Sequence, residues 1–344
     1  MNLILFNFES NKNSQALAFA LDWINEIAKN VDKLYVISLR CGNFEVLNNV
    51  EVHCINQDKK TKLETIFSIW KVLIKIHNKD KNINGYFVHM AHYFVPIIYP
   101  LAKWYKQKIV LWYAHKSVPF SLRLAGILVD KIFSISSSSM LLKTDKFEAI
   151  GHGIDTKNRF ILKEKFKNKI QNIVTVGRIS KVKNIHIIVN SFILLNMKDI
   201  YLYIVGDIIT EEDKNYLYHI KKIIPNSFKD NIIFTGIIPF EKLHNFYQNM
   251  DLAINLGDGG LDKAIIEPMA MGIPVITSNE TAKNIFEHLN GKGIYLLKKK
   301  EDLKEVLNEI IEYNILFDKI LLREEIVKKH SLNNLSKKIL GEFL

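Results

Sequence analysis

Two cations, Arg178 and Lys183, stand five residues apart, directly after an apolar segment over 173–176 and at the start of a helical pattern. A guanidinium and an ammonium group beside a helix N-terminus form an anion site, because their charges add to the partial positive charge of the backbone N–H groups. Gly177 precedes them and permits close approach to the backbone. A pyrophosphate fits such a site. The alternative is a solvated basic turn. Considered without the rest of the sequence, the two cations favour this alternative.

A glycine-rich segment follows the predicted strand over 252–255. It reads Gly257-Asp258-Gly259-Gly260-Leu261-Asp262-Lys263 and continues as Ala264-Ile265-Ile266-Glu267-Pro268. The glycines let backbone N–H groups line a pocket. The carboxylate of Glu267 accepts hydrogen bonds and suits two vicinal hydroxyls, such as those of a ribose. The alternative for Glu267 is a partly exposed helix carboxylate. Pro268 predicts a helix that begins close to Glu267 or is kinked there.

The elements that must position these residues alternate between strand and helix. In the second half, strands over 173–176, 201–205, 232–234, 252–255 and 274–277 alternate with helical patterns over 184–195, 211–224, 240–249 and 264–271. In the first half, strands are predicted over 3–8, 34–39, 50–55, 86–90, 109–113 and 131–135, with helices over 14–28 and 61–77. Such alternation predicts α/β domains with parallel sheets, whose ligands bind outside the carboxyl ends of the strands. A polar, lysine-rich stretch between Gly153 and Gln171 predicts the boundary between a domain over 1–160 and a domain over 161–332.

Charge and composition narrow the choice of partner and compartment. The formal net charge is +11, and residues 1–160 hold 21 Lys and Arg against 13 Asp and Glu. A basic half predicts nucleic acid, an anionic membrane surface or a phosphorylated substrate, unless its lysines only maintain solubility. The only two cysteines, Cys41 and Cys54, cannot build a disulfide framework or a zinc site and fit a reducing compartment.

The chain is expected to be cytoplasmic, with a peripheral contact at the inner membrane face. Its first residues lack a basic region, and their apolar run is too short for a signal peptide. The uncharged stretch 85–102 contains two histidines, two prolines and three tyrosines, and predicts a buried strand followed by a short helix rather than a membrane span.

Four segments together resemble the family 4 (group 1) retaining glycosyltransferases. They are Val176-Gly177-Arg178 with Lys183-Asn184, the run from Leu261 to Ile276 around Glu267, Gly151-His152-Gly153-Ile154-Asp155, and Trp112-Tyr113-Ala114-His115-Lys116. The resemblance is strongest from Ile109 to Ile276. It implies the GT-B fold, in which two Rossmann-like domains with parallel sheets face each other across a deep cleft. It also implies that a terminal helix over about 333–344 packs back on the first domain.

The resemblance implies a role for each matching residue. Arg178 and Lys183 would bind the donor diphosphate and assist catalysis, Glu267 would bind the ribose, and His115 would lie near the transferred sugar. The loop that cradles phosphate and sugar would comprise Gly259, Gly260, Leu261, Asp262, Lys263, Ala264 and Ile265. Two departures stand out: Gly259 occupies the place of the family's first glutamate, and the loop over 8–13 lacks the glycines often found after the first strand.

The expected activity is transfer, with retention of configuration, of a sugar from a nucleotide-diphosphate sugar to a glycan or lipid-linked acceptor, in cell-surface polysaccharide or glycolipid synthesis. No Asp-x-Asp pair occurs, so we expect neither a metal nor another cofactor, and the charge on the leaving diphosphate would be balanced by the two cations and helix N-termini. Gly259 leaves open a catalytically silent homologue. A basic nucleic-acid-binding protein is the other alternative, but the aromatic residues fall mostly on apolar faces, and no nucleic-acid partner is expected. No GxGxxG motif follows a strand, which argues against a nicotinamide enzyme.

Overall fold

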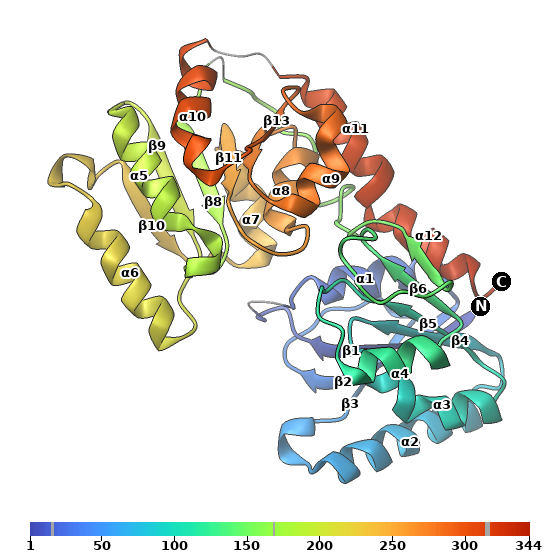
Figure 1. The fold of residues 1–344 in the computed structure, drawn as a ribbon. Helices are drawn as coiled ribbons and strands as arrows, with labels where there is room; N and C mark the ends of the chain where they lie inside the picture. Colours follow the sequence, from blue (N-terminus) through green and yellow to red (C-terminus); the bar gives the residue numbers. More distant parts are fainter. Residues whose placement is uncertain (15–16, 168, 314–316) are drawn as a thin grey trace. The chain divides into compact units, whose positions relative to one another are not determined.

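The computed structural model describes residues 1–14, 17–167, 169–313 and 317–344. The chain forms two compact units, one comprising Met1–Asp155 with Lys329–Leu344 and the other comprising Thr156–Lys328. Each unit contains one β-sheet with helices on both faces, and the strand pairs within each sheet are parallel (Figure 1). The predicted fold class of Rossmann-like domains with parallel sheets is therefore confirmed in both units.

The sheet of unit 1 has the strand order β3-β2-β1-β4-β5-β6-β7. Its strands are β1 Asn2–Ser10, β2 Lys33–Cys41, β3 Val50–Cys54, β4 Ile83–His89, β5 Lys108–Trp112, β6 Lys131–Ser134 and β7 Phe147–Ala149. The apolar run at Leu3–Phe6 in β1 is buried. A central strand of a parallel sheet is apolar on both sides because helices cover both faces.

Among the described residues of unit 1, five helices cover this sheet. They are α1 Ala20–Ala28, α2 Lys62–Lys79, α3 Phe94–Trp104, α4 Phe120–Leu128 and α12 Leu332–Gly341. Helices α2, α3 and α4 share one apolar core with the sheet, whereas α12 packs on α1 on the opposite face (Figure 1). Asn333 in α12 donates a 2.7 Å hydrogen bond to the carboxylate of Glu26 in α1.

Local sequence explains where α2 begins. Its N-cap Thr61 accepts a hydrogen bond from the N–H of Glu64, and the Glu64 carboxylate accepts one from the N–H of Thr61. This reciprocal pair satisfies two backbone donors that the first helical turn leaves without partners. The predicted strand and short helix over 85–102 are confirmed as β4 and α3.

The helix predicted from Ser14 begins six residues later, at Ala20, and residues 15–16 of that prediction lie outside the described residues. Strand β7 was not predicted, since it is only three residues long. Within the described ranges, no helix combines the length and the apolar character that crossing a membrane requires.

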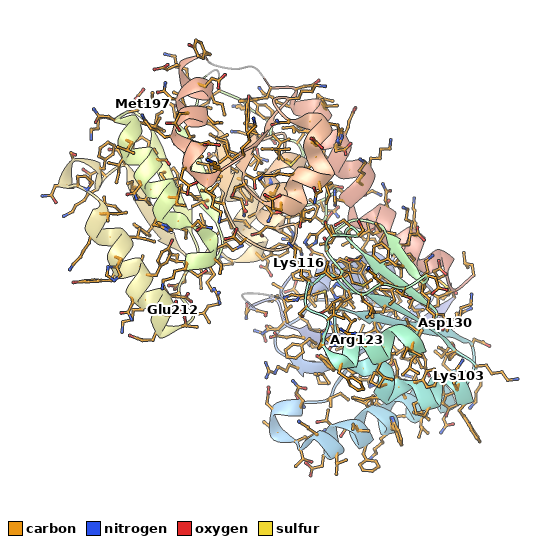
Figure 2. The ribbon with its side chains drawn as sticks, in the orientation of Figure 1. Lys103, Lys116, Arg123, Asp130, Met197 and Glu212 are labelled. Atoms are coloured by element: carbon orange, nitrogen blue, oxygen red, sulfur yellow. A yellow bond between two sulfur atoms is a disulfide. The ribbon has the colours of Figure 1, made fainter. Side chains whose placement is uncertain are left out.

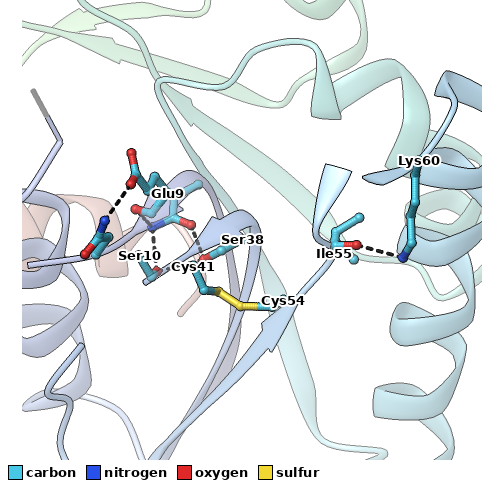
Figure 3. Close-up of a disulfide and its surroundings, with 9 residues drawn as sticks. Glu9, Ser10, Ser38, Cys41, Cys54, Ile55 and Lys60 are labelled. Atoms are coloured by element: carbon cyan, nitrogen blue, oxygen red, sulfur yellow. Dashed lines mark hydrogen bonds between the residues drawn. A yellow bond between two sulfur atoms is a disulfide. The ribbon is translucent and has the colours of Figure 1, made fainter. Parts of the chain in front are cut away.

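A disulfide joins Cys41, at the end of β2, to Cys54, at the end of β3 (Figure 3). The two strands are adjacent and parallel, with Ser38 paired to Cys54, and the two Cα atoms lie 6.0 Å apart. The sequence was interpreted only as fitting a reducing compartment, and the structure pairs the two cysteines. The cysteine content gives no support to a reducing compartment.

The sheet of unit 2 has the strand order β10-β9-β8-β11-β12-β13. Its strands are β8 Asn172–Val176, β9 Tyr201–Val205, β10 Ile232–Gly236, β11 Leu252–Asn255, β12 Val275–Thr277 and β13 Ile294–Leu296. After β8, the chain adds β9 and β10 on one side of that strand and then β11, β12 and β13 on the other side. The loops that follow these two neighbouring strands therefore meet at the topological switch point, where open α/β sheets bind ligands.

In the described segments 169–313 and 317–330, seven helices follow or connect these strands. They are α5 Ile185–Leu195, α6 Glu211–Ile223, α7 Phe240–Tyr247, α8 Lys263–Ala270, α9 Glu280–Phe286, α10 Leu303–Glu312 and α11 Lys319–His330. Helices α5, α6 and α10 share an apolar core with one face of the sheet, and α8 packs against β11 and β12 (Figure 1). The last strand, β13, and helices α9, α10 and α11 were not predicted from the sequence.

Helix α8 corrects the interpretation of Pro268. The helix begins at Lys263, with Asp262 as its N-cap, which agrees within one residue with the pattern predicted over 264–271. The alternative of a helix that begins close to Glu267 is wrong. Pro268 occupies the final turn, and the helix ends two residues later at Ala270. The missing N–H of proline therefore removes one hydrogen bond near the end of a short helix.

Candidate functional site

The loop after β8 carries both predicted diphosphate ligands. Gly177 follows the strand with φ of 145°, a conformation that favours glycine, and a 3-10 turn spans Lys181–Lys183 before α5. A Cβ atom at Gly177 would lie 3.2 Å from Cε of Lys183. The glycine therefore gives the lysine side chain room to fold back over the end of β8.

Asn184 connects this loop to the loop after β11. It is the N-cap residue of α5 and adopts a left-handed conformation with φ of 53°. Its side-chain amide donates to the carbonyl of Leu256 at 2.9 Å and to the carboxylate of Asp258 at 3.2 Å. The N–H of Asp258 in turn donates to the carbonyl of Val182 at 3.0 Å. These bonds hold the two loops of the switch point together.

Lys183 and Asp262 form an ion pair across the same two loops. Asn255, the last residue of β11, also donates to the Asp262 carboxylate at 3.1 Å. Burial raises the pKa of Asp262, but the charge and hydrogen bond of Lys183, together with the hydrogen bonds of Asn255 and Ala264, outweigh burial and lower that pKa overall. Lys183 thus lies at the switch point, with its ammonium group beside the N-terminus of α8.

Arg178 faces a different carboxylate. Its Nε atom lies 3.9 Å from Oδ2 of Asp213, and its side chain is 41% exposed. Asp213 belongs to the first turn of α6, where the N–H groups of Ile209 and Thr210 donate to its carboxylate. Burial raises the pKa of Asp213, but hydrogen bonds from Ile209 and Thr210, together with the charge of Arg178, outweigh burial and lower that pKa. The guanidinium is held near the loop and remains accessible from solvent.

The glycine-rich loop is oriented by residues that follow β12. The side-chain amide of Asn279 donates to the carbonyls of Gly257 and Gly260, at 3.0 Å each, and Thr281 donates to the carbonyl of Gly259 at 3.3 Å. In a trans peptide the carbonyl and the following N–H point in opposite directions. The N–H groups of Gly260 and Leu261 therefore point away from Asn279 and Thr281.

These N–H groups form a donor edge at the N-terminus of α8. Within the described chain, the backbone N–H groups of residues 259–262 donate no hydrogen bond to another protein group. A Cβ atom at Gly259 or Gly260 would have no heavy atom within 4 Å, so the loop borders open space. Successive N–H groups before a helix attract an anion, and Lys183 adds a full positive charge.

Glu267 lies one turn into α8 and is only 3% exposed. The alternative interpretation of Glu267 as a partly exposed helix carboxylate is therefore wrong. Burial raises the pKa of Tyr247 well above its usual value, and the charges of Glu267 and Asp262 raise it further, which places these three groups in one neighbourhood. Burying a carboxylate costs free energy unless it is hydrogen-bonded. Glu267 therefore belongs to the packed interior of unit 2 and is not a solvated side chain.

His115 belongs to unit 1 and follows β5. Its Nδ1 accepts a hydrogen bond from the N–H of Ser117 at 3.0 Å and lies 2.9 Å from the Ser117 hydroxyl. Because Nδ1 is the acceptor, the neutral imidazole carries its proton on Nε2. The side chain is exposed, so Nε2–H is a donor available to a ligand.

The sequence predicted site residues at Arg178, Lys183, Glu267 and the glycine-rich loop, and the structure places all of them in unit 2. The sequence prediction missed Asp213, Asn255 and Asn279, which face or anchor them. A signal for two of these was present, because Asn255 ends the predicted strand over 252–255 and Asn279 follows the predicted strand over 274–277 by two residues. Polar residues at the carboxyl ends of parallel strands are site candidates.

Residues 170–313 match the family model of group 1 glycosyl transferases. The matched segment contains Arg178, Lys183, the glycine-rich loop and Glu267. An uncharacterized glycosyltransferase of Methanocaldococcus jannaschii is 33% identical over 181 residues, which make up 50% of this chain and 42% of that protein. These findings support a group 1 glycosyltransferase domain over residues 170–313.

Solved structures resemble the whole chain. HepE of Anabaena, in complex with UDP and glucose, has a TM-score of 0.74 and 15% sequence identity, with 99% of each chain covered. A glycosyltransferase from Rickettsia africae has a TM-score of 0.76 and 17% identity, covering 99% of this chain and 97% of its own. At this identity the likeness shows the fold, and it confirms the GT-B class.

Proposed function

We propose that this chain is a retaining glycosyltransferase of family 4 that takes its sugar from a nucleotide-diphosphate sugar. The observation that carries the proposal is the donor edge of residues 259–262 beside Lys183 at the switch point of unit 2. A diphosphate is the group that uses successive N–H donors and a cation together. The UDP complexes of HepE make UDP the first nucleotide to test.

In the proposed reaction the bond between the sugar C1 and the β-phosphate oxygen breaks. A new bond forms between C1 and the acceptor hydroxyl oxygen on the same face of the sugar, and the hydroxyl proton passes to the leaving diphosphate. Negative charge grows on the diphosphate as the bond breaks. Arg178, Lys183 and the loop N–H groups would then bind the transition state more strongly than the ground state, which raises turnover.

Two further residues would bind other parts of the donor. Glu267 would bind the ribose, and the Nε2–H of His115 would donate to an oxygen of the transferred sugar. The proposal includes no metal and no other cofactor. The acceptor would be a glycan or a lipid-linked saccharide in cell-surface polysaccharide or glycolipid synthesis, with the protein in the cytoplasm and at the inner membrane face.

Thermal melting with UDP, GDP, ADP and CMP, and then with their sugar conjugates, tests the donor class. A ligand that binds only the folded state raises the melting temperature by mass action. We expect one nucleoside diphosphate to raise the melting temperature. We also expect donor hydrolysis or transfer to persist in EDTA. Retention is checked by the anomeric NMR signals of the product. Loss of activity in EDTA with recovery in magnesium would contradict the metal-free account, and nucleotide binding without turnover would indicate a silent homologue.

A further inference from the structure

The positive charge of the chain is concentrated in one stretch of unit 1. Residues 59–127 contain twelve Lys and Arg but only two Asp and Glu, whereas the whole chain has a formal net charge of +11. This stretch contains α2, α3 and α4, which lie side by side on one face of the sheet (Figure 1). Six of the twelve cations lie on these three helices, whose only carboxylate is Glu64, so the helical layer itself carries an excess of positive charge.

Helix α2 has large apolar residues on the side that faces away from the core. Its inner stripe comprises Ile69, Leu73 and Ile76, which are buried against the sheet. Its outer stripe contains Leu63, Phe67, Lys71 and Ile74, and Phe67 is 63% exposed. The outer face of a helix in a soluble domain is normally polar, so this stripe requires an explanation.

Helices α3 and α4 repeat the pattern. Phe120, Arg123 and Ile127 follow one another at helical spacing on the outer side of α4, and Phe120 is 80% exposed. At the end of α3, Trp104 is also 80% exposed and follows the exposed Lys103. Figure 2 labels Lys103 and Arg123 on these helices. We call the outer side chains Leu63, Phe67, Lys71, Ile74, Lys103, Trp104, Phe120, Arg123 and Ile127 the α2–α4 face.

We propose that the α2–α4 face docks on a lipid bilayer that contains anionic lipids. Helices that lie in a membrane interface combine Trp, Phe and Leu, which enter the acyl boundary, with Lys and Arg, which bind the headgroups. The face holds both classes and has few carboxylates to repel an anionic surface. A nucleic acid would use the cations and aromatic rings, but it would offer nothing to the aliphatic side chains of Leu63, Ile74 and Ile127.

The first experiment measures cosedimentation of the full chain with phosphatidylcholine vesicles, with and without phosphatidylglycerol, in the absence of any donor. We expect binding only when phosphatidylglycerol is present. Lys71→Gln with Arg123→Gln removes two cations and should weaken binding by about 25-fold, because each basic residue near the surface contributes about fivefold. The matched charge control is Lys229→Gln with Lys304→Gln, two exposed lysines of unit 2, which should bind like the wild type.

The apolar contribution is tested by Phe67→Ser with Phe120→Ser. This pair should also reduce vesicle binding, by tenfold or more, whereas Leu194→Ser with Tyr313→Ser, at similarly exposed positions of unit 2, should not. Trp104 is a native reporter: its emission should shift to shorter wavelength on vesicles, and Trp104→Phe should abolish the shift while preserving binding. Circular dichroism melts confirm that each variant is folded.

Three results would overturn the proposal. The first is that the chain does not bind anionic vesicles at low salt. The second is that the unit 2 control variants lose as much binding as the α2–α4 variants. The third is that Phe67→Ser with Phe120→Ser leaves vesicle binding unchanged while a single-stranded oligonucleotide competes equally, which would indicate a polyanion site. The inference rests on the membrane contact of the proposed function, but it does not depend on the transfer reaction. Nucleotide affinity, measured by titration on the same variants, should stay unchanged, so failure of one proposal is distinguishable from failure of the other.

Discussion

The ammonium group of Lys183 is paired with the carboxylate of Asp262, a residue 79 positions away that also caps α8. One side chain therefore neutralises the cation and starts the helix whose N-terminus borders the candidate anion site. A diphosphate that binds Lys183 must compete with this carboxylate for the ammonium group.

Asp262→Asn should increase the affinity for the nucleoside diphosphate by about twofold to fivefold, the range expected for a partly exposed ion pair. Asparagine keeps a side-chain oxygen for the N–H of Ala264, so α8 remains capped. Isothermal titration measures the effect. In the background of Lys183→Gln the same change should have no effect on affinity. Weaker binding in Asp262→Asn alone would show that the carboxylate itself contacts the ligand.

Arg178→Ala and Lys183→Ala should each cost about 2–4 kcal/mol of transition-state stabilisation, by analogy with loss of one oxyanion donor. Because both cations are proposed to act on one diphosphate, the double variant should lose less than the sum of the two. Glu267→Ala should chiefly weaken donor binding. Donor hydrolysis and transfer kinetics, with melting curves as a folding check, measure these effects. A folded double variant with near-normal kinetics would remove the diphosphate site from this pair.

Asn279 should act on the nucleotide through the glycine-rich loop. Asn279→Asp keeps the oxygen that accepts from the N–H of Ala282, so it preserves the cap of α9. It replaces the donor to Gly257 and Gly260 with an oxygen that two carbonyls repel. We expect nucleoside diphosphate affinity to fall about tenfold, the equivalent of about 1.4 kcal/mol and comparable to one lost hydrogen bond. Asn279→Ala provides the comparison, because it loses both functions. Unchanged affinity in a folded Asn279→Asp variant would show that the loop needs no anchor.

His115→Ala should lower kcat by about tenfold or more, equivalent to about 1.4 kcal/mol of barrier, while leaving the affinity for the bare nucleoside diphosphate nearly unchanged. The reason is that the proposed Nε2–H donor contacts the sugar rather than the nucleotide. Steady-state kinetics and nucleotide titration on the same preparation separate the two effects. An equal loss in nucleotide affinity would contradict this placement.

The disulfide between Cys41 and Cys54 should protect both thiols from alkylation until a reductant is added. Its sequence separation of 13 corresponds to about 3 kcal/mol in the loop-entropy model, so Cys41→Ser with Cys54→Ser should lower the free energy of unfolding by up to that amount. Mass spectrometry after maleimide labelling, and denaturant melts, provide the measurements. Full labelling of the native protein without reductant would show that the bond does not form in solution.

Local patterns in the sequence predicted much of the fold. The apolar runs of β1, β8 and β11 and the helical periodicity of α2, α5 and α6 are set by residues a few positions apart, so they can be read along the chain. The same holds for Arg178 and Lys183, which share a single strand-to-helix loop. Helix α8 was predicted within one residue at each end, but the burial of Glu267 and the place of Pro268 in the final turn could not be predicted, because they depend on what packs around them. The short strand β13 offered too few residues for a periodic signal.

Only the tertiary structure decided which loops became neighbours. The order β10-β9-β8-β11-β12-β13 brings Lys183 to Asp262, and Asn279 to Gly257 and Gly260. The order β3-β2-β1 likewise brings Cys41 to Cys54. The residue types at the candidate site, and their placement after strands, were determined by the sequence. Their partners depend on strand order and register, which come from packing across the whole sheet, because hydrogen bonds and ion pairs form between groups that are close in space and not between groups that are close along the chain.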